Sequence, residues 1–141
     1  MLRIVKQLTN YTENLLIMAT ERFMKAKARA MIKPYAYIQS MGSLATAGTP
    51  DLYISGEKDC WVEWKHDEVT KGAIKPKLSA LQRQWCDNRS DEGRNVIVVV
   101  TTDSKNGILY RNTGEEYEWQ AHSNIRQPLK EIIEFILGQV L

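Results

Sequence analysis

The segment Val96–Val100 limits most strongly the folds that this chain can adopt. It consists of β-branched residues alone and predicts a strand over Asn95–Thr101 that is buried on both faces. Such a strand needs other elements packed against both sides of its sheet. No apolar run in the chain is longer, whereas a membrane span takes roughly 20 apolar residues. We therefore expect an α/β fold and no membrane partner.

Three further segments predict helices. Thr12–Lys33 contains neither Gly nor Pro and is rich in Ala, Met, Leu, Glu and Lys, so it predicts a helix that ends before Pro34. Ser79–Asn88 predicts a second helix, and Pro128–Leu141 predicts a final amphipathic helix.

Short segments rich in aromatic and β-branched residues predict additional strands. These are Tyr35–Ser40, Asp51–Ser55, Cys60–Lys65 and, as an edge strand, Ile108–Tyr110. Residues 56–59 fit a hairpin turn, while residues 41–49 and 67–77 have the composition of loops. The core order is helix, three strands, helix and strand (α-β-β-β-α-β), followed by the final helix. This order predicts a mixed central sheet flanked by helices.

The composition fits a single domain in a reducing compartment. The chain has 141 residues, of which 43% are hydrophobic and 26% charged, so residues 1–141 are enough to form one core. Two cysteines do not make a disulfide framework. Arg3, Lys6 and Asn10 interrupt any signal-peptide pattern at the N-terminus. We expect a cytoplasmic protein.

Positive charge is concentrated in the first quarter of the chain. Residues 1–34 hold seven basic and two acidic side chains, although the whole chain has a net charge of only +2. At about 100° per residue, four of the basic side chains share one stripe of the first predicted helix. They are Arg22, Lys25, Arg29 and Lys33. Phe23, Met24 and Met31 lie roughly opposite and predict the core side. The stripe suits a polyanion, although a solvent-exposed helix face shows the same pattern.

Asp51 and Glu63 lie on neighbouring strands of the predicted hairpin, which are about 4.8 Å apart. On one face, their carboxylates are close enough to share a divalent cation such as Mg²⁺, which relieves their mutual repulsion. Lys65 follows Glu63 by two residues and points to the same face, whereas Trp64 points to the other. A lysine beside such a metal can orient a water and stabilise charge that develops on a phosphate. An ordinary surface hairpin with a cross-strand Glu and Lys is the alternative.

The order and spacing of these motifs resemble a known enzyme group. Pro50-Asp51 followed by Glu63-Trp64-Lys65 resembles the PD-(D/E)XK nuclease superfamily. Other motifs are similar to its VRR-NUC (virus-type replication-repair nuclease) branch. They are Gly48-Thr49-Pro50-Asp51-Leu52, Lys77-Leu78-Ser79-Ala80-Leu81-Gln82, Trp85 and the valine-rich strand. The resemblance covers about residues 20–102 and implies a restriction-endonuclease-like core.

The resemblance implies a Mg²⁺-dependent DNA endonuclease that hydrolyses phosphodiester bonds, with Mn²⁺ as a substitute metal. Asp51, Glu63 and the backbone carbonyl of Trp64 would bind the metal, Lys65 would activate the attacking water, and no small-molecule cofactor is implied. The chain resembles phage members of the branch, which act in the host cytoplasm on branched DNA such as Holliday junctions. A restriction-type or nicking nuclease on ordinary duplex is one alternative. An inactive DNA-binding module of the same fold is another.

These nucleases usually add an acidic residue from the first helix. The helix runs back alongside the first strand, and about 13 residues before Lys33 it reaches the level of the Asp51 strand. Glu21 fits this position, whereas Glu13 overshoots it by about 12 Å and is our second choice. A plain surface glutamate is the alternative for Glu21.

Gln82 has two interpretations. The resemblance places it near the metal as a catalytic-site residue. The pattern Ser79-x-x-Gln82 is also a capping box, in which the glutamine only closes the helix start.

Other basic and polar residues complete the predicted DNA contacts. The resemblance includes a basic loop after the Glu63 strand, and its lysines would grip the DNA backbone together with the helix stripe. These lysines are Lys71, Lys75 and Lys77. His66 follows Lys65 and could contact a phosphate, but we expect it to face solvent.

Paired cuts across a four-way junction need two active sites, which predicts a C₂ homodimer. The apolar face of the final helix, with Ile132, Phe135 and Ile136, is wide enough to meet a partner as well as the sheet. Closure of the monomer core alone is the alternative role for this helix.

Overall fold

The structure is a computed structural model that describes residues 2–42, 48–67, 76–112, 119–121 and 126–141. Within these residues the chain forms three α-helices and one seven-stranded sheet. The helices are α1 (Leu2–Ile32), α2 (Ala80–Asp91) and α3 (Leu129–Val140). The strands are β1 (Tyr37–Ser40), β2 (Leu52–Ser55), β3 (Asp59–His66), β4 (Asn95–Thr101), β5 (Asn106–Asn112), β6 (Trp119–Ala121) and β7 (Gln127–Pro128).

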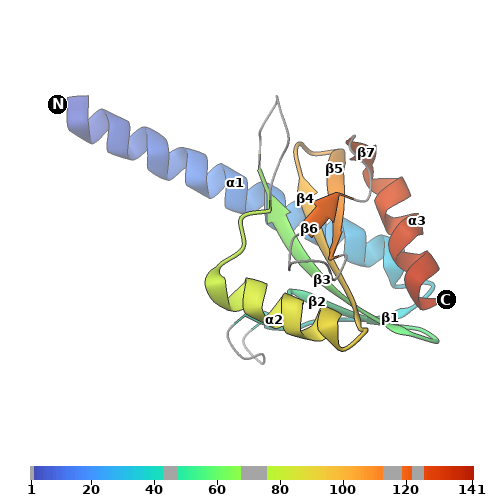
Figure 1. Ribbon diagram of the computed structural model, residues 1–141. Helices are drawn as coiled ribbons and strands as arrows, with labels where there is room; N and C mark the ends of the chain where they lie inside the picture. The colour runs from blue at the N-terminus through green and yellow to red at the C-terminus, as the bar shows by residue number, and fades with distance from the viewer. Residues whose placement is uncertain (1, 43–47, 68–75, 113–118, 122–125) are drawn as a thin grey trace.

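The sheet is mixed, as the order of elements predicts. Its strands follow the order β1-β2-β3-β4-β5-β6, and β7 pairs with β5. Only β3 and β4 pair in parallel, because α2 carries the chain back across the sheet between them. The other pairs are antiparallel. The predicted mixed α/β architecture, with helices around a central sheet, is therefore confirmed (Figure 1).

The two faces of the sheet belong to different hydrophobic clusters. On one face, Val62 and Trp64 of β3 and Val99 of β4 join a large core with residues of α1 and α3. On the other face, Val98 and Val100 form a smaller cluster with residues of β5. β4 is buried on both faces, as its β-branched run predicts. The alternation of β3 thus directs Glu63 and Lys65 to the face opposite Trp64.

Several predicted boundaries were wrong. α1 begins at Leu2 rather than Thr12. β5 is an interior strand rather than an edge strand, because β6 pairs with its outer side. The pattern did not predict β6 and β7, since strands of three and two residues are too short to show a period of two. Phe23 is 59% exposed rather than part of the core side of α1, whereas Met24 on the same turn is fully buried.

The apolar face of α3 closes the monomer core. Leu129, Ile132, Ile133, Ile136 and Val140 are buried. Phe135 and Leu137 pack partly buried against the same core. The surplus width predicted for this helix is therefore used within the chain.

The first half of α1 projects beyond the sheet (Figure 1). Large apolar side chains along this part are exposed. They are Leu2, Ile4, Val5, Leu8, Tyr11, Leu15 and Leu16. None of the helices in the described parts of the chain has the length and apolarity needed to cross a membrane.

Candidate active site

The β2–β3 hairpin brings Asp51 next to the Glu63-Trp64-Lys65 segment. The antiparallel register pairs Leu52 with Val62, so Asp51 lies just beyond the last paired position. The backbone N–H of Trp64 donates a hydrogen bond to Asp51 Oδ2 at 2.9 Å. The aspartate side chain therefore continues the ladder where the β2 backbone ends. In a strand, the N–H and C=O of one residue point to the same side, so the Trp64 carbonyl is also directed toward Asp51.

Glu63 is a buried carboxyl with one satisfied and one unsatisfied oxygen. Its Oε1 accepts a hydrogen bond from Gln82 Nε2 at 3.2 Å and lies 3.6 Å from Lys65 Nζ. Its Oε2 is buried and has no hydrogen-bond partner among the described residues. Burial raises the pKa of Glu63 to about 8, repulsion from Asp51 is the next cause, and Lys65 opposes it. The carboxyl of Asp51 also raises this pKa because the two carboxyls can share a proton, a contact that gives Oε2 no separate donor group. A buried oxygen without a donor is a suitable ligand for a cation.

The donor atoms around Glu63 are oxygens, the type of ligand that Mg²⁺ takes in proteins. Asp51 and Glu63 are two neighbouring carboxyls, and strand geometry directs the Trp64 carbonyl toward Asp51. In the described part of the chain, no three His, Cys, Asp or Glu side chains converge into a complete metal cage. Mg²⁺ does not need one, because it is usually bound by one or two carboxylates and keeps several waters.

The structure brings Glu21 rather than Glu13 toward these carboxylates. Glu21 is half-buried on α1, and burial followed by repulsion from Asp51 raises its pKa. Lys25, Lys65 and His66 act in the opposite direction on the same group. Glu13 is exposed on the projecting part of α1. Glu21 therefore lies in the electric field of the candidate site, as the length of the helix predicts.

Two lysines balance the acidic groups. Lys65 Nζ lies 3.6 Å from Glu63 Oε1, and Lys25 Nζ lies 3.6 Å from Asp51 Oδ1. Both lysine side chains keep about a quarter of their surface exposed. Lys25, which we predicted as a phosphate contact, thus belongs to the carboxylate cluster and remains accessible to a phosphate there.

Gln82 closes the capping box of α2 and also contacts the candidate site. Its backbone N–H donates to Ser79 Oγ at 3.1 Å, and its Oε1 accepts from the Ser79 N–H at 2.9 Å, which completes the capping box. Its Nε2 donates to Glu63 Oε1 at the same time. The cap holds the amide oxygen of Gln82, and this leaves the amide nitrogen directed at the Glu63 carboxyl.

Gly48 couples the Asp51 segment to the start of α2. Its φ is +90°, and a Cβ there would lie 2.5 Å from the backbone oxygen of Leu81 and 3.2 Å from the backbone nitrogen of Gln82. Only glycine allows this approach, because backbone atoms cannot move aside as a flexible side chain does. The glycine of the G-x-P-D pattern therefore sets the distance between Asp51 and Gln82.

We expect Gly48→Ala to lower the free energy of unfolding by about 2–4 kcal/mol, from backbone strain together with overpacking. Gly93→Ala is the matched control: Gly93 has a φ of +81°, but nothing lies within 4 Å of a Cβ there. Strain alone should lower its stability by about 1–2 kcal/mol. Urea denaturation of both variants measures the difference. Equal losses would show that Gly48 makes no special contact with α2.

His66 does not face solvent as we predicted. It is 8% exposed, and its Nδ1 lies 2.8 Å from Thr101 Oγ1. Thr101 Oγ1 donates its proton to the Lys65 carbonyl at 3.2 Å, so Nδ1 is the donor in the bond to Thr101. His66 and Thr101 hold the backbone beside Lys65, and no sequence signal links them because they lie 35 positions apart.

The remaining predicted DNA contacts lie around this cluster. Arg22 and Arg29 are exposed on α1. Lys77 is 84% exposed and pairs with Asp67 at 3.5 Å, a surface ion pair that a phosphate can replace at little cost. Lys71 and Lys75 lie outside the described residues.

Comparison of the chain with models of protein families, with curated proteins and with solved structures finds no match. The function is therefore inferred from the contacts of Glu63 with Lys65 and Gln82 beside Asp51, with Glu21 in electrostatic range.

Proposed function

We propose that the protein is a metal-dependent endodeoxyribonuclease with a restriction-endonuclease-like core of the VRR-NUC type. The observation that carries this proposal is the Glu63 carboxyl, which is buried beside Asp51 and Lys65 with one oxygen that lacks a hydrogen-bond partner among the described residues. An isolated surface hairpin, the alternative interpretation, would leave Glu63 exposed and both oxygens solvated. The order of α1, the three strands, α2 and the parallel strand β4 supports the same core.

The residues of the site divide the chemistry of phosphodiester hydrolysis between them. Bound Mg²⁺ would polarise the scissile phosphate and lower the pKa of a bound water. Asp51, Glu63 and the Trp64 carbonyl would hold the ion. Lys65 Nζ, beside Glu63, would orient the attacking water and stabilise the negative charge that develops on the phosphate. Gln82 fixes the rotamer of Glu63 through its amide.

The basic surface near the site supports nucleic acid as the substrate. Lys25 links the carboxylate cluster to the stripe on α1, where Arg22 and Arg29 are exposed. Contacts to phosphates position a nucleic acid without reading its sequence. We therefore propose a nuclease that selects DNA by structure, with branched DNA such as a Holliday junction as the preferred substrate. Paired cuts across a junction require a second copy of the chain, so the proposal includes a homodimer.

Cleavage of a panel of DNAs tests the proposal. The substrates are a four-way junction, a nicked duplex and a linear duplex, each incubated with Mg²⁺, with Mn²⁺ or with EDTA. We expect metal-dependent cutting that is fastest on the junction and leaves a 5′-phosphate. Equal cutting of the linear duplex would favour the restriction-type alternative. Binding without cutting would leave a DNA-binding module.

The stripe on α1 predicts the salt dependence of DNA binding. Each lost phosphate contact makes the negative slope of log K against log salt shallower by about 0.9 on duplex DNA. The double variant Arg22→Ala with Arg29→Ala should therefore make it shallower by about 1.8. Lys27→Ala with Lys130→Ala is the matched control, because both lysines are exposed but lie off the stripe. Fluorescence anisotropy in EDTA over a range of salt concentrations measures the slopes. A slope that the arginine pair leaves unchanged would make the stripe an ordinary solvated face.

A further inference from the structure

The first half of α1 carries an apolar seam that is open to solvent. It consists of Ile4, Leu8, Tyr11 and Leu15, which follow one another at intervals of four, three and four residues. This is the spacing at which one helix packs against another. The four side chains keep between 48% and 63% of their surface exposed, and all side chains of residues 2–13 are exposed. The described part of the chain therefore leaves this seam uncovered.

The charged side chains of this half lie on the other side of the helix. At about 100° per residue, the seven exposed apolar side chains of the projecting part fall within one half of the helix circumference. Arg3, Lys6 and Glu13 fall within the other half, together with Met24 and Ala28, which are buried in the core farther along α1. The apolar half therefore points away from the core.

The apolar half is large enough for a stable interface. Burying the exposed part of one such side chain removes on the order of 100 Å² of apolar surface. The seven together present up to about 700 Å² per copy, and specific interfaces bury roughly 600–1,000 Å² per partner. Helices of about 12–15 residues without tertiary packing are marginal in water, so a partner would also stabilise the projecting half.

A second copy of the chain is the partner that fits this face. Paired cuts across a junction require two copies, and the apolar face of α3 is used within the monomer core. A membrane surface fits less well, because helices that lie on one are rich in Lys and Arg. Residues 2–16 carry only two basic side chains and one acidic side chain.

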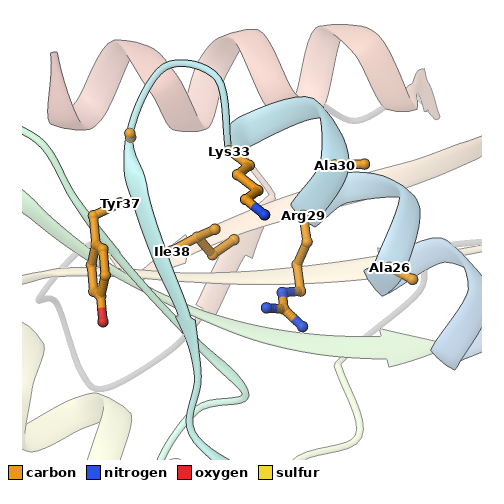
Figure 2. A pocket seen from close by; sticks show the side chains of 7 residues that line it. Ala26, Arg29, Ala30, Lys33, Tyr37 and Ile38 are labelled. Atoms are coloured by element: carbon orange, nitrogen blue, oxygen red, sulfur yellow. The ribbon is translucent and has the colours of Figure 1, made fainter.

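The charge on the second half of α1 decides the direction in which two copies pair. Arg22, Arg29 and Lys33 continue the seam along the same side of the helix. Figure 2 shows Arg29 and Lys33 extending in the same direction from the last turns of α1, where they and Ile38 line a cavity of about 600 Å³ between α1 and β1. A parallel pair would bring these cations of the two copies together, and like charges in an interface repel. An antiparallel pair places them at opposite ends.

We propose that two copies pair antiparallel through the first halves of their α1 helices. Leu8 of each copy packs against the partner's Tyr11, and Ile4 packs against the partner's Leu15. This register gives every residue of the seam an apolar counterpart. The proposal rests on the homodimer of the proposed function and assigns it an interface.

The pairing also sets the separation of the two candidate sites. In this register the two-fold axis crosses α1 midway between Leu8 and Tyr11. Glu21 lies about 11–12 residues from the axis, which is roughly 17 Å along the helix. The two sites therefore lie roughly 35 Å apart along the paired helices.

The mass of the free protein tests the interface without DNA or metal. Analytical ultracentrifugation of micromolar protein in EDTA should give about twice the 16.2 kDa of one chain. Leu8→Glu should raise the Kd of the dimer at least about 100-fold, because it buries an unpaired charge in the seam. Asn10→Glu is the matched control, since Asn10 is exposed on the charged side of the same helix, and it should keep the dimer.

Cysteine pairs test the direction of the helices. Leu8→Cys mixed with Tyr11→Cys should form a disulfide between two chains under mild oxidation, whereas neither variant should do so alone. The native Cys60 and Cys86 are buried and do not compete. A disulfide formed by Leu8→Cys alone would require a parallel pair and would overturn the proposed arrangement.

Other outcomes separate this interface from the nuclease. A wild-type chain that stays monomeric at micromolar concentration would overturn the interface, as would a dimer that Leu8→Glu leaves intact. Binding of a wild-type monomer to phosphatidylglycerol vesicles, lost in Leu8→Glu, would assign the face to a membrane instead. A protein that pairs as proposed but cuts no DNA would keep the interface and lose the nuclease, whereas a monomer that cuts the junction would do the reverse.

Discussion

Asp51→Asn and Glu63→Gln should each reduce metal-dependent DNA cleavage at least about 10³-fold while DNA binding persists. Both variants keep the shape of the side chain but remove a charged oxygen that would hold the metal. The hydrogen bond from the Trp64 N–H to Asp51 Oδ2 can form with the asparagine oxygen, so the hairpin should stay intact. Phosphate contacts come from other residues, and the loss of a negative charge favours the approach of DNA.

Glu57→Gln is the control for this result, because Glu57 is exposed in the β2–β3 turn and should keep wild-type cleavage. Cleavage of a labelled junction and anisotropy in EDTA give the two readouts on the same preparations. Metal-dependent cutting by both Asp51→Asn and Glu63→Gln at the wild-type rate would contradict the assignment of the site. Loss of binding together with cleavage would show that the carboxylates shape the DNA surface instead.

Glu63→Gln should also make the metal-free protein more stable at alkaline pH. Burial and Asp51 raise the pKa of Glu63 to about 8, against a reference value of 4.5. Between these values the folded chain keeps a proton that the unfolded chain releases. The wild-type free energy of unfolding therefore falls as the pH rises through this window, by about 1.4 kcal/mol per unit. Glutamine does not titrate, so this contribution disappears in the variant.

The expected gain is roughly 3–5 kcal/mol above pH 8 relative to acidic pH, the integral of that slope over the window. Urea denaturation in EDTA at pH 5, 7 and 9 measures it as the difference between variant and wild type, in which the other titrating groups cancel. A constant difference between Glu63→Gln and wild type at all three values would mean that Glu63 ionises in the folded protein as it does in the unfolded chain.

The core of the site was accessible to sequence reasoning because its contacts are local or follow from strand geometry. Asp51 and Glu63 lie on the two arms of one short hairpin, so the turn determines their register. The period of two places Glu63 and Lys65 on one face. The rise of the helix selects Glu21 over Glu13. The fold class followed from Val96–Val100 in the same way, since a strand without polar residues needs cover on both faces.

The parts that the sequence did not reveal depend on partners that are distant along the chain. His66 can be buried because its Nδ1 forms a hydrogen bond with the Thr101 hydroxyl on the neighbouring strand. The dual contact of Gln82 needs the cap at Ser79 and the carboxyl of Glu63 together. The cavity beside Ile38 exists only where β1 meets α1. No pattern of hydrophobicity or charge encodes such pairings, because each arises from how the elements pack.

The early start of α1 has a local cause of a different kind. Thr9 and Thr12 are weak helix formers, and polar Asn10 interrupts the apolar pattern. The Thr9 hydroxyl donates to the Val5 carbonyl at 2.9 Å, and the Thr12 hydroxyl donates to the Leu8 carbonyl at 2.9 Å. These bonds satisfy the threonine hydroxyls inside the helix, so the segment is compatible with a helix although the pattern did not predict one before Thr12.

The projecting start of α1 gives this helix two regions of unequal local stability. From Met24 onward, Met24, Ala28 and Ile32 are fully buried, so opening this region requires unfolding of the core. Nearer the N-terminus, Leu8 and Tyr11 are exposed, and fraying there breaks backbone hydrogen bonds alone. The border falls within one turn of Glu21. Fraying that advances a single turn too far therefore moves Glu21 away from the candidate site, and whatever stiffens the first half of α1 also holds Glu21 in place.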